Sequence, residues 1–464
     1  MPPIDYSIKN LDKVVKLDGI IKNAEYTRLT APGENFLSLV LRVDIDVERD
    51  GKKKTVSTVA KRVPLGSNNF ALHMNIQSMK NEIKFYSDLI PILTKFASEN
   101  GVDASELFPK YYGSRLSLDS INGDADREAL IVLENLIPLG YRNEDRYIGF
   151  DLVTTRAILK SLALFHVIPL ALKFKNPEQF KHVKEFLDST HPKPPGGPHD
   201  GPPRGPKPPG DLPPPAGLPP PGGHPPLHGP PPPQGPHGGP PGPPPNGGPP
   251  GRPNFPDGKG PDQVFFDTFK DMPELAPYIT KFGPLISRAN EPPIFGNKPG
   301  KEPWATIGHS DFWVNNIMVK PVAGKEPLIK IVDFQVTGYK SFATDLVFFL
   351  LSSVRNDVVQ DYFDDLLRFY YEEFTSTLKK FKVNLELTYK EYLDELQTAA
   401  KDQETRHALT FTTIIFGEKN SSIDWAVENV DMFTQMGKMI KNMNQYQKDK
   451  IIVIASEVCR RNWV

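Results

Sequence analysis

Two short stretches in the second half of the chain carry side chains suited to phosphoryl transfer. The first, Gly308–Lys320 (GHSDFWVNNIMVK), contains Asp311 and Asn316, and the second, Ile331–Gln335 (IVDFQ), contains Asp333. Phosphoryl transfer requires a carboxylate that accepts or orients the attacking hydroxyl, and oxygen ligands that hold Mg²⁺ against the phosphates. Asp311 is the candidate for the catalytic carboxylate. Asn316 and Asp333 are the candidates for the metal ligands.

The order and spacing of these three residues form a stronger signal than any one of them. Taken alone, each is ordinary, because aspartate is common in caps and turns and asparagine is common in loops. Residues 316–320 and 327–332 are predicted strands joined by a turn that contains a glycine. Such a hairpin would return Asp333 to the loop that carries Asp311.

The first 135 residues contain elements that would hold a nucleotide. Residues 36–47 are rich in Val, Leu and Ile and predict a strand, which a turn at 48–52 connects to a partner strand at 55–63. Apolar residues at helical spacing predict a helix over 70–96. Residues 129–136 predict a short buried strand. An antiparallel sheet with an inserted helix is therefore expected.

A lysine and a glutamate in this region form the expected phosphate-anchoring pair. Lys61 lies near the end of the second predicted strand, where a lysine reaches the α- and β-phosphates, and Glu82 lies on the following helix. In the competing interpretation Lys61 is a surface residue at a strand end, Arg62 competes for its role, and Glu82 is a solvated helix residue.

Two further segments complete the predicted nucleotide site. Residues 32–38 occupy the place of a loop that covers the phosphates. Because this loop has a single glycine, backbone amides and the side chains of Asn35 and Ser38 are expected to make the contacts. Glu134 and Leu136 fall where a hinge would hold the adenine through backbone groups, which need no particular side chain.

The remainder of the chain is predicted to be mostly helical. An α+β fold with two lobes is therefore expected, a small lobe at 1–135 and a large lobe at 136–464 that an insertion at 192–260 interrupts. The helices expected in the large lobe lie at 154–167, 345–353 and 357–381.

The insertion consists almost entirely of Pro, Gly and His and holds more than half of the chain's 50 prolines. Such a composition offers too few large apolar residues to offset the entropy of ordering, so a disordered or polyproline-like segment is expected. Its many PxxP spacings are compatible with an SH3 or WW ligand, although they are unavoidable at this proline density. An inert linker is the favoured interpretation.

Composition limits the remaining possibilities. The chain of 464 residues contains 55 Lys and Arg residues and 56 Asp and Glu residues. This near-zero net charge argues against a general nucleic-acid binder. The single cysteine, Cys459, excludes an intramolecular disulfide and suits a reducing compartment. No secretory signal and no membrane span are expected, because the apolar run near Phe348 is too short to cross a bilayer. We therefore expect a cytoplasmic protein.

The motifs together resemble the insect ecdysteroid kinase-like (CHK kinase-like) family, which is related to choline kinases and aminoglycoside phosphotransferases. The matching pieces are GENFLSLV, VAKRVP, NEIKFYSDLIP, LVLENL, LALFHV, GHSDFWVNNIMV and IVDFQ. The resemblance implies a protein-kinase-like bilobal fold with ATP and Mg²⁺ as cofactors. It also implies that Asp311 is the base, that Asn316 and Asp333 are metal ligands, and that Lys61 and Glu82 anchor the phosphates.

The chain departs from the family pattern at a few positions. Ser310 stands where the family commonly has glycine, and Asn135 stands where an aspartate is frequent. The insertion is not an expected family feature. Asp345 fits the segment that follows the magnesium motif, where the family's aspartate is structural. No departure removes a candidate catalytic group.

The resemblance leaves three functions open. The first is a kinase that phosphorylates a hydroxyl of a small molecule, an ecdysteroid or a hydroxylated xenobiotic. The second is a choline- or ethanolamine-type kinase, and the third is a pseudokinase or scaffold that uses the proline-rich insertion. A wall of aromatic residues would suit a steroid acceptor, although such residues more often belong to the core. The aromatic residues considered for this wall are Phe165, Trp304, Trp313, Tyr339 and Phe342.

The composition of the insertion leads to a first prediction. Replacing residues 195–255 with a short Gly/Ser linker should leave ATP binding and thermal stability nearly unchanged, because a segment without large apolar residues contributes little to a core. Calorimetric titration and thermal unfolding of the two chains measure this. A large loss of either property would show that the insertion packs on the rest of the protein.

Overall fold

The computed structural model describes most of the chain outside the insertion. Residues before 191 and after 260 belong to one compact unit, so the predicted lobe boundary at 135 stays a prediction. Asn35, the rest of the loop up to residue 37 and the insertion lie outside the described residues. The described ranges are 5–30, 38–64, 69–118, 124–190, 261–288, 300–415, 417 and 438–464.

A five-stranded antiparallel sheet forms in the first part of the chain, with the strand order β1-β2-β3-β5-β4. The predicted hairpin is confirmed by the pairing of β2 and β3 from Leu39↔Arg62 to Arg49↔Lys52. Asp50 and Gly51 make its two-residue turn with φ of 50° and 71°, a conformation that the Asp-Gly pair favours. The strands are β1 (Ile20–Arg28), β2 (Leu39–Arg49), β3 (Lys52–Arg62), β4 (Tyr111–Arg115) and β5 (Leu130–Glu134).

The helix predicted over 70–96 is also confirmed, with one irregularity. The segment comprises α2 (Asn69–Lys84), a π-helical turn η1 (Phe85–Leu89) and α3 (Ile90–Glu99). A π-helical turn inserts an extra residue into the helix and changes the direction of the side chains around it. Here Phe85 is fully buried and stacks on Phe334 of the IVDFQ motif, with ring centroids 4.2 Å apart.

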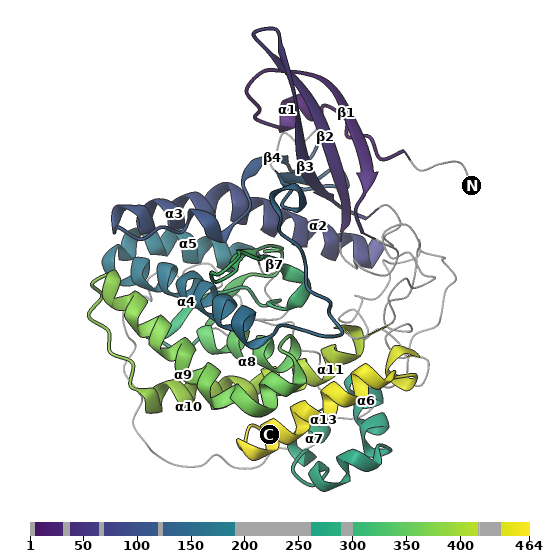
Figure 1. The fold of residues 1–464 in the computed structure, drawn as a ribbon, viewed down its shortest axis with the longest axis vertical. Helices are drawn as coiled ribbons and strands as arrows, with labels where there is room; N and C mark the ends of the chain where they lie inside the picture. Colours follow the sequence, from purple (N-terminus) through teal and green to yellow (C-terminus); the bar gives the residue numbers. More distant parts are fainter. Residues whose placement is uncertain are drawn as a thin grey trace, which may run out of the picture. The chain divides into compact units, whose positions relative to one another are not determined.

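The larger part of the unit is helical (Figure 1), and α4 and α9 lie side by side in it. The three helices predicted here are confirmed, although α4 continues through Pro169 to Lys175. The longer helices are α4 (Leu152–Lys175), α5 (Pro177–Thr190), α6 (Pro261–Lys270), α8 (Phe342–Ser352), α9 (Asn356–Lys380), α10 (Tyr389–Ala399), α11 (Thr405–Ile415) and α13 (Gln445–Arg460). The shorter helical elements are α1 (Leu11–Val14), Ser105–Leu107, Ile137–Leu139, Pro273–Tyr278, α7 (Gly283–Ser287), Val314–Asn316 and the π-helical turn η7 (Ala400–Glu404).

Two small antiparallel pairs of strands interrupt the helices. The predicted hairpin is confirmed as β7 (Ile317–Lys320) paired with β8 (Leu328–Ile331). A second pair, β6 (Ala305–Gly308) with β9 (Gly338–Ser341), was not predicted from the sequence. Because β6 precedes the GHSDFWVNN segment and β9 precedes α8, this pair fixes the start of the candidate catalytic loop beside the start of that helix.

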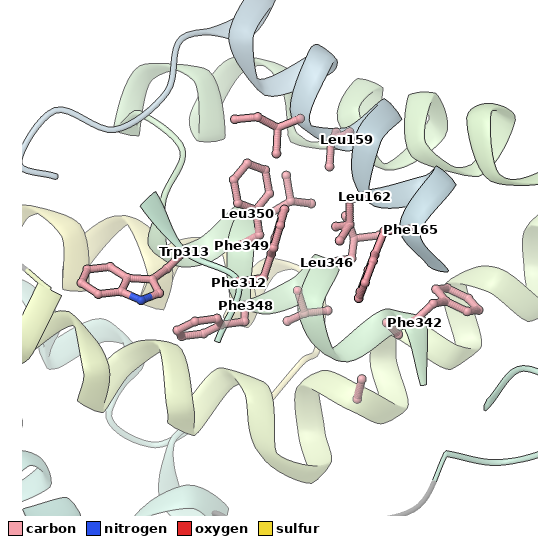
Figure 2. Packing of buried hydrophobic residues seen from close by; sticks show 14 of the residues in the cluster. Leu159, Leu162, Phe165, Phe312, Trp313, Phe342, Leu346, Phe348, Phe349 and Leu350 are labelled. Atoms are coloured by element: carbon pink, nitrogen blue, oxygen red, sulfur yellow. The ribbon is translucent and has the colours of Figure 1, made fainter. Parts of the chain in front are cut away.

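The core beneath this loop is built by α4 and α8. Figure 2 shows Leu159, Leu162 and Phe165 of α4 together with Leu346 and Phe349 of α8 and with Phe312 of the loop. All six side chains are buried, and burial of apolar surface at about 25 cal/mol per Å² is the main source of stability. Of the described helices, α4 alone is long and apolar enough to cross a membrane, and 72% of its apolar window is buried inside the fold, as in a core helix.

Lys450 of α13 provides a test of the packing far from the motifs. Its side chain is buried, with 2% of the residue exposed, and its Nζ donates to the carbonyl of Val354 at 2.5 Å. Burial lowers the pKa of Lys450 from its ordinary 10.5 to about 7. Between these values the unfolded chain binds more protons than the folded chain, so Lys450 makes stability rise with pH.

We predict that Lys450→Met raises the free energy of unfolding by about 2 kcal/mol below pH 7, where the buried ammonium must be charged. The gain should shrink as pH rises from 7 towards 10.5. Denaturation curves at several pH values measure it, with Lys448→Met on the exposed face of α13 as the matched control. A gain independent of pH would contradict the assignment of a buried charged lysine.

Candidate active site

The predicted phosphate-anchoring pair is brought together. Lys61 Nζ lies 2.7 Å from Glu82 Oε2 and 2.7 Å from Asp333 Oδ1, so β3, α2 and the IVDFQ motif meet at one ammonium group. Only 7% of Lys61 is exposed. Arg62, the competitor, points elsewhere, because successive side chains of a strand face opposite sides, and its guanidinium lies 3.9 Å from Glu128. The interpretation of Lys61 as a surface residue is wrong.

The charges in this cluster do not balance. Burial alone would lower the pKa of Lys61, but the carboxylates of Asp333 and Glu82 hold it above its usual range, so the ammonium stays charged. Burial, with the nearby charge of Asp333, raises the pKa of Glu82 to about 7 in spite of Lys61. One cation therefore serves two carboxylates, and a further cation bound at Asp333 would relieve the excess negative charge.

The second part of the site is the loop that carries Asp311 and Asn316. The Asn316 amide Nδ2 donates to the Asp311 carboxylate at 2.9 Å and to the Asp311 carbonyl at 2.8 Å. The hairpin that follows keeps this loop beside Asp333, since Val332 N–H donates to the carbonyl of Asn316 at 3.0 Å. The hairpin therefore returns Asp333 to the loop that carries Asp311 and Asn316, as the sequence predicted.

Asp345 fixes the backbone of this loop by accepting hydrogen bonds from it. Its carboxylate accepts the N–H of His309 at 2.6 Å and the N–H of Ser310 at 2.8 Å, and it lies 3.0 Å from His166 Nε2. Burial would raise the pKa of Asp345, but hydrogen bonds from the His166 side chain and the His309 backbone hold it below its usual range. His166 in turn contacts the Tyr370 hydroxyl at 2.8 Å.

His309 joins the two motifs. Its Nε2 lies 3.0 Å from the carbonyl of Val332, which can only accept, so Nε2 carries the proton. Its Nδ1 is then free to accept the N–H of Asp311 at 3.3 Å. The side chain therefore aligns the backbone of Asp311 with the strand that precedes Asp333.

Two residues of the site have backbone conformations that side chains disfavour. Ser310 has a φ of 67° and Asp333 has a φ of 71°, both in the left-handed region. Such strain gathers at functional sites because the surrounding contacts outweigh its cost. The left-handed φ of Ser310 gives a physical reason for the glycine that the family pattern commonly has there.

Asp311 has the electrostatic setting of a proton acceptor. Burial and the nearby charge of Asp333 raise the pKa of its carboxyl group, while His309, His407 and the Asn316 amide oppose the rise. A general base is most effective when its pKa lies closer to the working pH than that of a free aspartate. Its side chain is half-buried, so an acceptor hydroxyl has access to it.

The donor groups fit ATP and Mg²⁺. Because the Asn316 amide nitrogen is used by Asp311, the amide oxygen remains available as a hard ligand beside the carboxylate of Asp333. The hydroxyl of Ser38, immediately before β2, is buried and has no hydrogen-bond partner among the described residues, as expected of a group that contacts a phosphate. The described part of the chain holds no cluster of three or more His, Cys, Asp or Glu side chains placed for a metal.

The predicted hinge lies at the end of β5. Glu134 N–H donates to the carbonyl of Lys110 at 2.8 Å, and Leu136 is buried. Between them, Asn135 accepts the N–H of Ile137 at 3.2 Å and donates to the Ser57 hydroxyl at 3.1 Å. Asparagine therefore holds the hinge by local hydrogen bonds, which leaves the adenine contacts of Glu134 and Leu136 as predictions.

The prediction that five aromatic residues line a wall for a steroid acceptor is wrong for at least two of them. Phe165 and Phe342 are fully buried in the core, where Phe165 packs against Phe334 and Phe342 packs against Phe374. The sequence also gave no role to His166, although a lone histidine in an apolar helix often marks a buried hydrogen-bonded group. Trp313, two residues after Asp311, is the member that lies in the catalytic loop.

Comparisons with known proteins agree with the motifs. The model of the ecdysteroid kinase-like family matches residues 32–194 and 263–383. A comparison with curated protein sequences gave no match. Solved structures with a likeness to this chain include three small-molecule phosphotransferases.

An ethanolamine kinase of Plasmodium vivax is 11% identical, with a TM-score of 0.36, over 90% of this chain and 80% of that chain. A microcompartment-associated aminopropanol kinase is 10% identical, with a TM-score of 0.38, over 94% and 93%. An aminoglycoside phosphotransferase in complex with GDP and kanamycin is 9% identical, with a TM-score of 0.34, over 86% of each chain.

The strain at Ser310 leads to a prediction. Ser310→Gly should raise the free energy of unfolding by about 1 kcal/mol, because it relieves the left-handed strain and removes a buried hydroxyl that has no partner in the described part of the chain. Together these gains outweigh the greater chain entropy of glycine. Ser310→Ala removes the hydroxyl but keeps the strain, so its gain should be smaller. Chemical denaturation of the three chains measures the order, and a Ser310→Gly chain less stable than Ser310→Ala would contradict it.

Proposed function

Because the chain belongs to the ecdysteroid kinase-like family, we propose that it transfers the γ-phosphoryl group of ATP to a hydroxyl of a small molecule. The observation that supports this best is the position of Lys61 Nζ, 2.7 Å from both Glu82 and Asp333. This cluster places the charge needed by the phosphates next to a candidate metal ligand and to the loop of Asp311. We also propose a cytoplasmic location, which is the expectation from the sequence.

The proposal assigns a residue to each part of the reaction. Lys61, held by Glu82, binds the α- and β-phosphates, and Asn316 and Asp333 bind Mg²⁺, which neutralises charge on the phosphates when bound. Asp311 accepts the proton of the acceptor hydroxyl. The hydroxyl oxygen forms a bond to the γ-phosphorus while the bond from that phosphorus to the bridging oxygen breaks, which releases ADP.

The finer parts of the proposal concern the acceptor. We favour an ecdysteroid or a hydroxylated xenobiotic, with choline and ethanolamine as the alternatives that an assay separates. A pseudokinase or scaffold is disfavoured, because burying one lysine with two carboxylates costs stability for a cluster that a scaffold does not need. An SH3 or WW contact through the insertion remains a hypothesis from composition alone.

The test is an ATP-consumption assay with Mg²⁺ against ecdysteroids, choline, ethanolamine and hydroxylated xenobiotics, with Asp311→Asn compared to wild type. Loss of the base should lower turnover by about 10²–10⁴-fold. Binding of Mg-ATP should change little, because Asp311 faces the acceptor and Lys61 faces the phosphates.

The outcomes separate the candidates. Turnover with one acceptor that disappears in Asp311→Asn supports the kinase and identifies its acceptor class. Turnover retained in Asp311→Asn would refute the role of this residue. Failure of the wild-type chain to bind Mg-ATP would favour the scaffold.

A further inference from the structure

His407 is a polar residue beside the candidate active site that none of the sequence motifs includes. It lies near the start of α11, which follows the π-helical turn η7 without a break. Such turns occur often at functional sites, because the extra residue redirects the side chains next to it. Glu404 closes this turn, and His407 lies three residues further on.

The imidazole of His407 is held on three sides. Its ring stacks on Phe348 with centroids 4.2 Å apart and planes 6° apart, and the ring of Phe411 meets it edge-on at 4.7 Å. Its Nδ1 lies 3.2 Å from the Glu404 carboxylate, of which only 5% is exposed. The His407 side chain remains 18% exposed, so it is fixed in place and still accessible.

The stacking contact places His407 next to the catalytic loop. Phe348 lies three residues after Asp345 on α8, and residues three apart share one face of a helix. Asp345 holds the backbone of His309 and Ser310, so the face that carries Phe348 supports the loop of Asp311. The two side chains also lie within electrostatic reach, because a proton on His407 would oppose the rise in the pKa of the Asp311 carboxyl group.

The partner of Nδ1 determines what the other ring nitrogen offers. A carboxylate accepts hydrogen bonds, so Nδ1 carries the proton and donates to Glu404. In the neutral ring Nε2 is then a hydrogen-bond acceptor. No residue in the described ranges pairs with Nε2. The group that fits it is a hydroxyl or an amine that carries a hydrogen.

Resting on the phosphotransferase function proposed above, we infer that His407 Nε2 accepts a hydrogen bond from a second donor group of the acceptor molecule. This donor lies near the hydroxyl that Asp311 deprotonates. His407 is then a specificity-determining residue that favours polyols and amino alcohols over molecules with a lone hydroxyl or a quaternary ammonium. Glu404 is a positioning residue that fixes the ring tautomer.

The test measures the Kd of two probe pairs by calorimetry on the full chain loaded with Mg-ADP. Ethanolamine and choline differ in the N–H donor, and a vicinal steroid diol and the same steroid with one hydroxyl differ in the O–H donor. In at least one pair the wild type should bind the donor-bearing member about tenfold more tightly, the contribution of one well-placed hydrogen bond. His407→Phe keeps a ring for stacking and should abolish this preference.

Matched variants separate hydrogen bonding from a structural effect. His407→Gln places an amide oxygen near the position of Nε2 and should keep the preference within about threefold. His182→Gln, at an exposed histidine of α5, should leave it unchanged. A preference that survives in His407→Phe, or that the wild type lacks in both pairs, overturns the inference. Full turnover in Asp311→Asn would instead refute the role of Asp311, and failure of the wild type to bind Mg-ATP would refute the proposed function, whatever the effect of the His407 variants.

Discussion

The geometry of the candidate site depends on one buried carboxylate, that of Asp345. It accepts two consecutive backbone N–H groups, from His309 and Ser310, and a third hydrogen bond from His166. A buried carboxylate without such partners would cost several kcal/mol, so the loop, α4 and α8 are held together by the need to satisfy it. The left-handed residue Ser310 is one of the two whose N–H groups Asp345 binds.

A second constraint connects the sheet to the helical part of the unit. The polar connection is Lys61, which pairs with Glu82 of α2 and with Asp333 of the IVDFQ motif. The apolar connection is Phe334, whose ring stacks on Phe85 and lies 5.8 Å from the ring of Phe165. Charge and packing therefore converge on neighbouring residues, so that a displacement of α2 would disturb the proposed phosphate anchor and the proposed metal ligand together.

Several irregular features of the backbone lie at or near residues discussed above. The π-helical turn η1 follows Glu82 by three residues, and η7 precedes His407. Ser310 and Asp333 are among the few non-glycine residues with a positive φ. Regular helices and strands position the core, whereas these departures lie next to side chains that we propose for phosphoryl transfer.

The sequence alone determined those features of this protein that residues close together in the chain specify. The spacing of Asp311, Asn316 and Asp333 and the hairpin between them could be predicted, because a short connection leaves few arrangements. The hairpin of β2 and β3 and the main helices could also be predicted, because the spacing of apolar residues that indicates them is a local property of the sequence. Only the tertiary structure decided between Lys61 and Arg62, removed Phe165 and Phe342 from the acceptor wall, and stacked His407 on Phe348 of α8. Burial and charge pairing depend on residues far apart in the chain, and no local pattern specifies which of them meet.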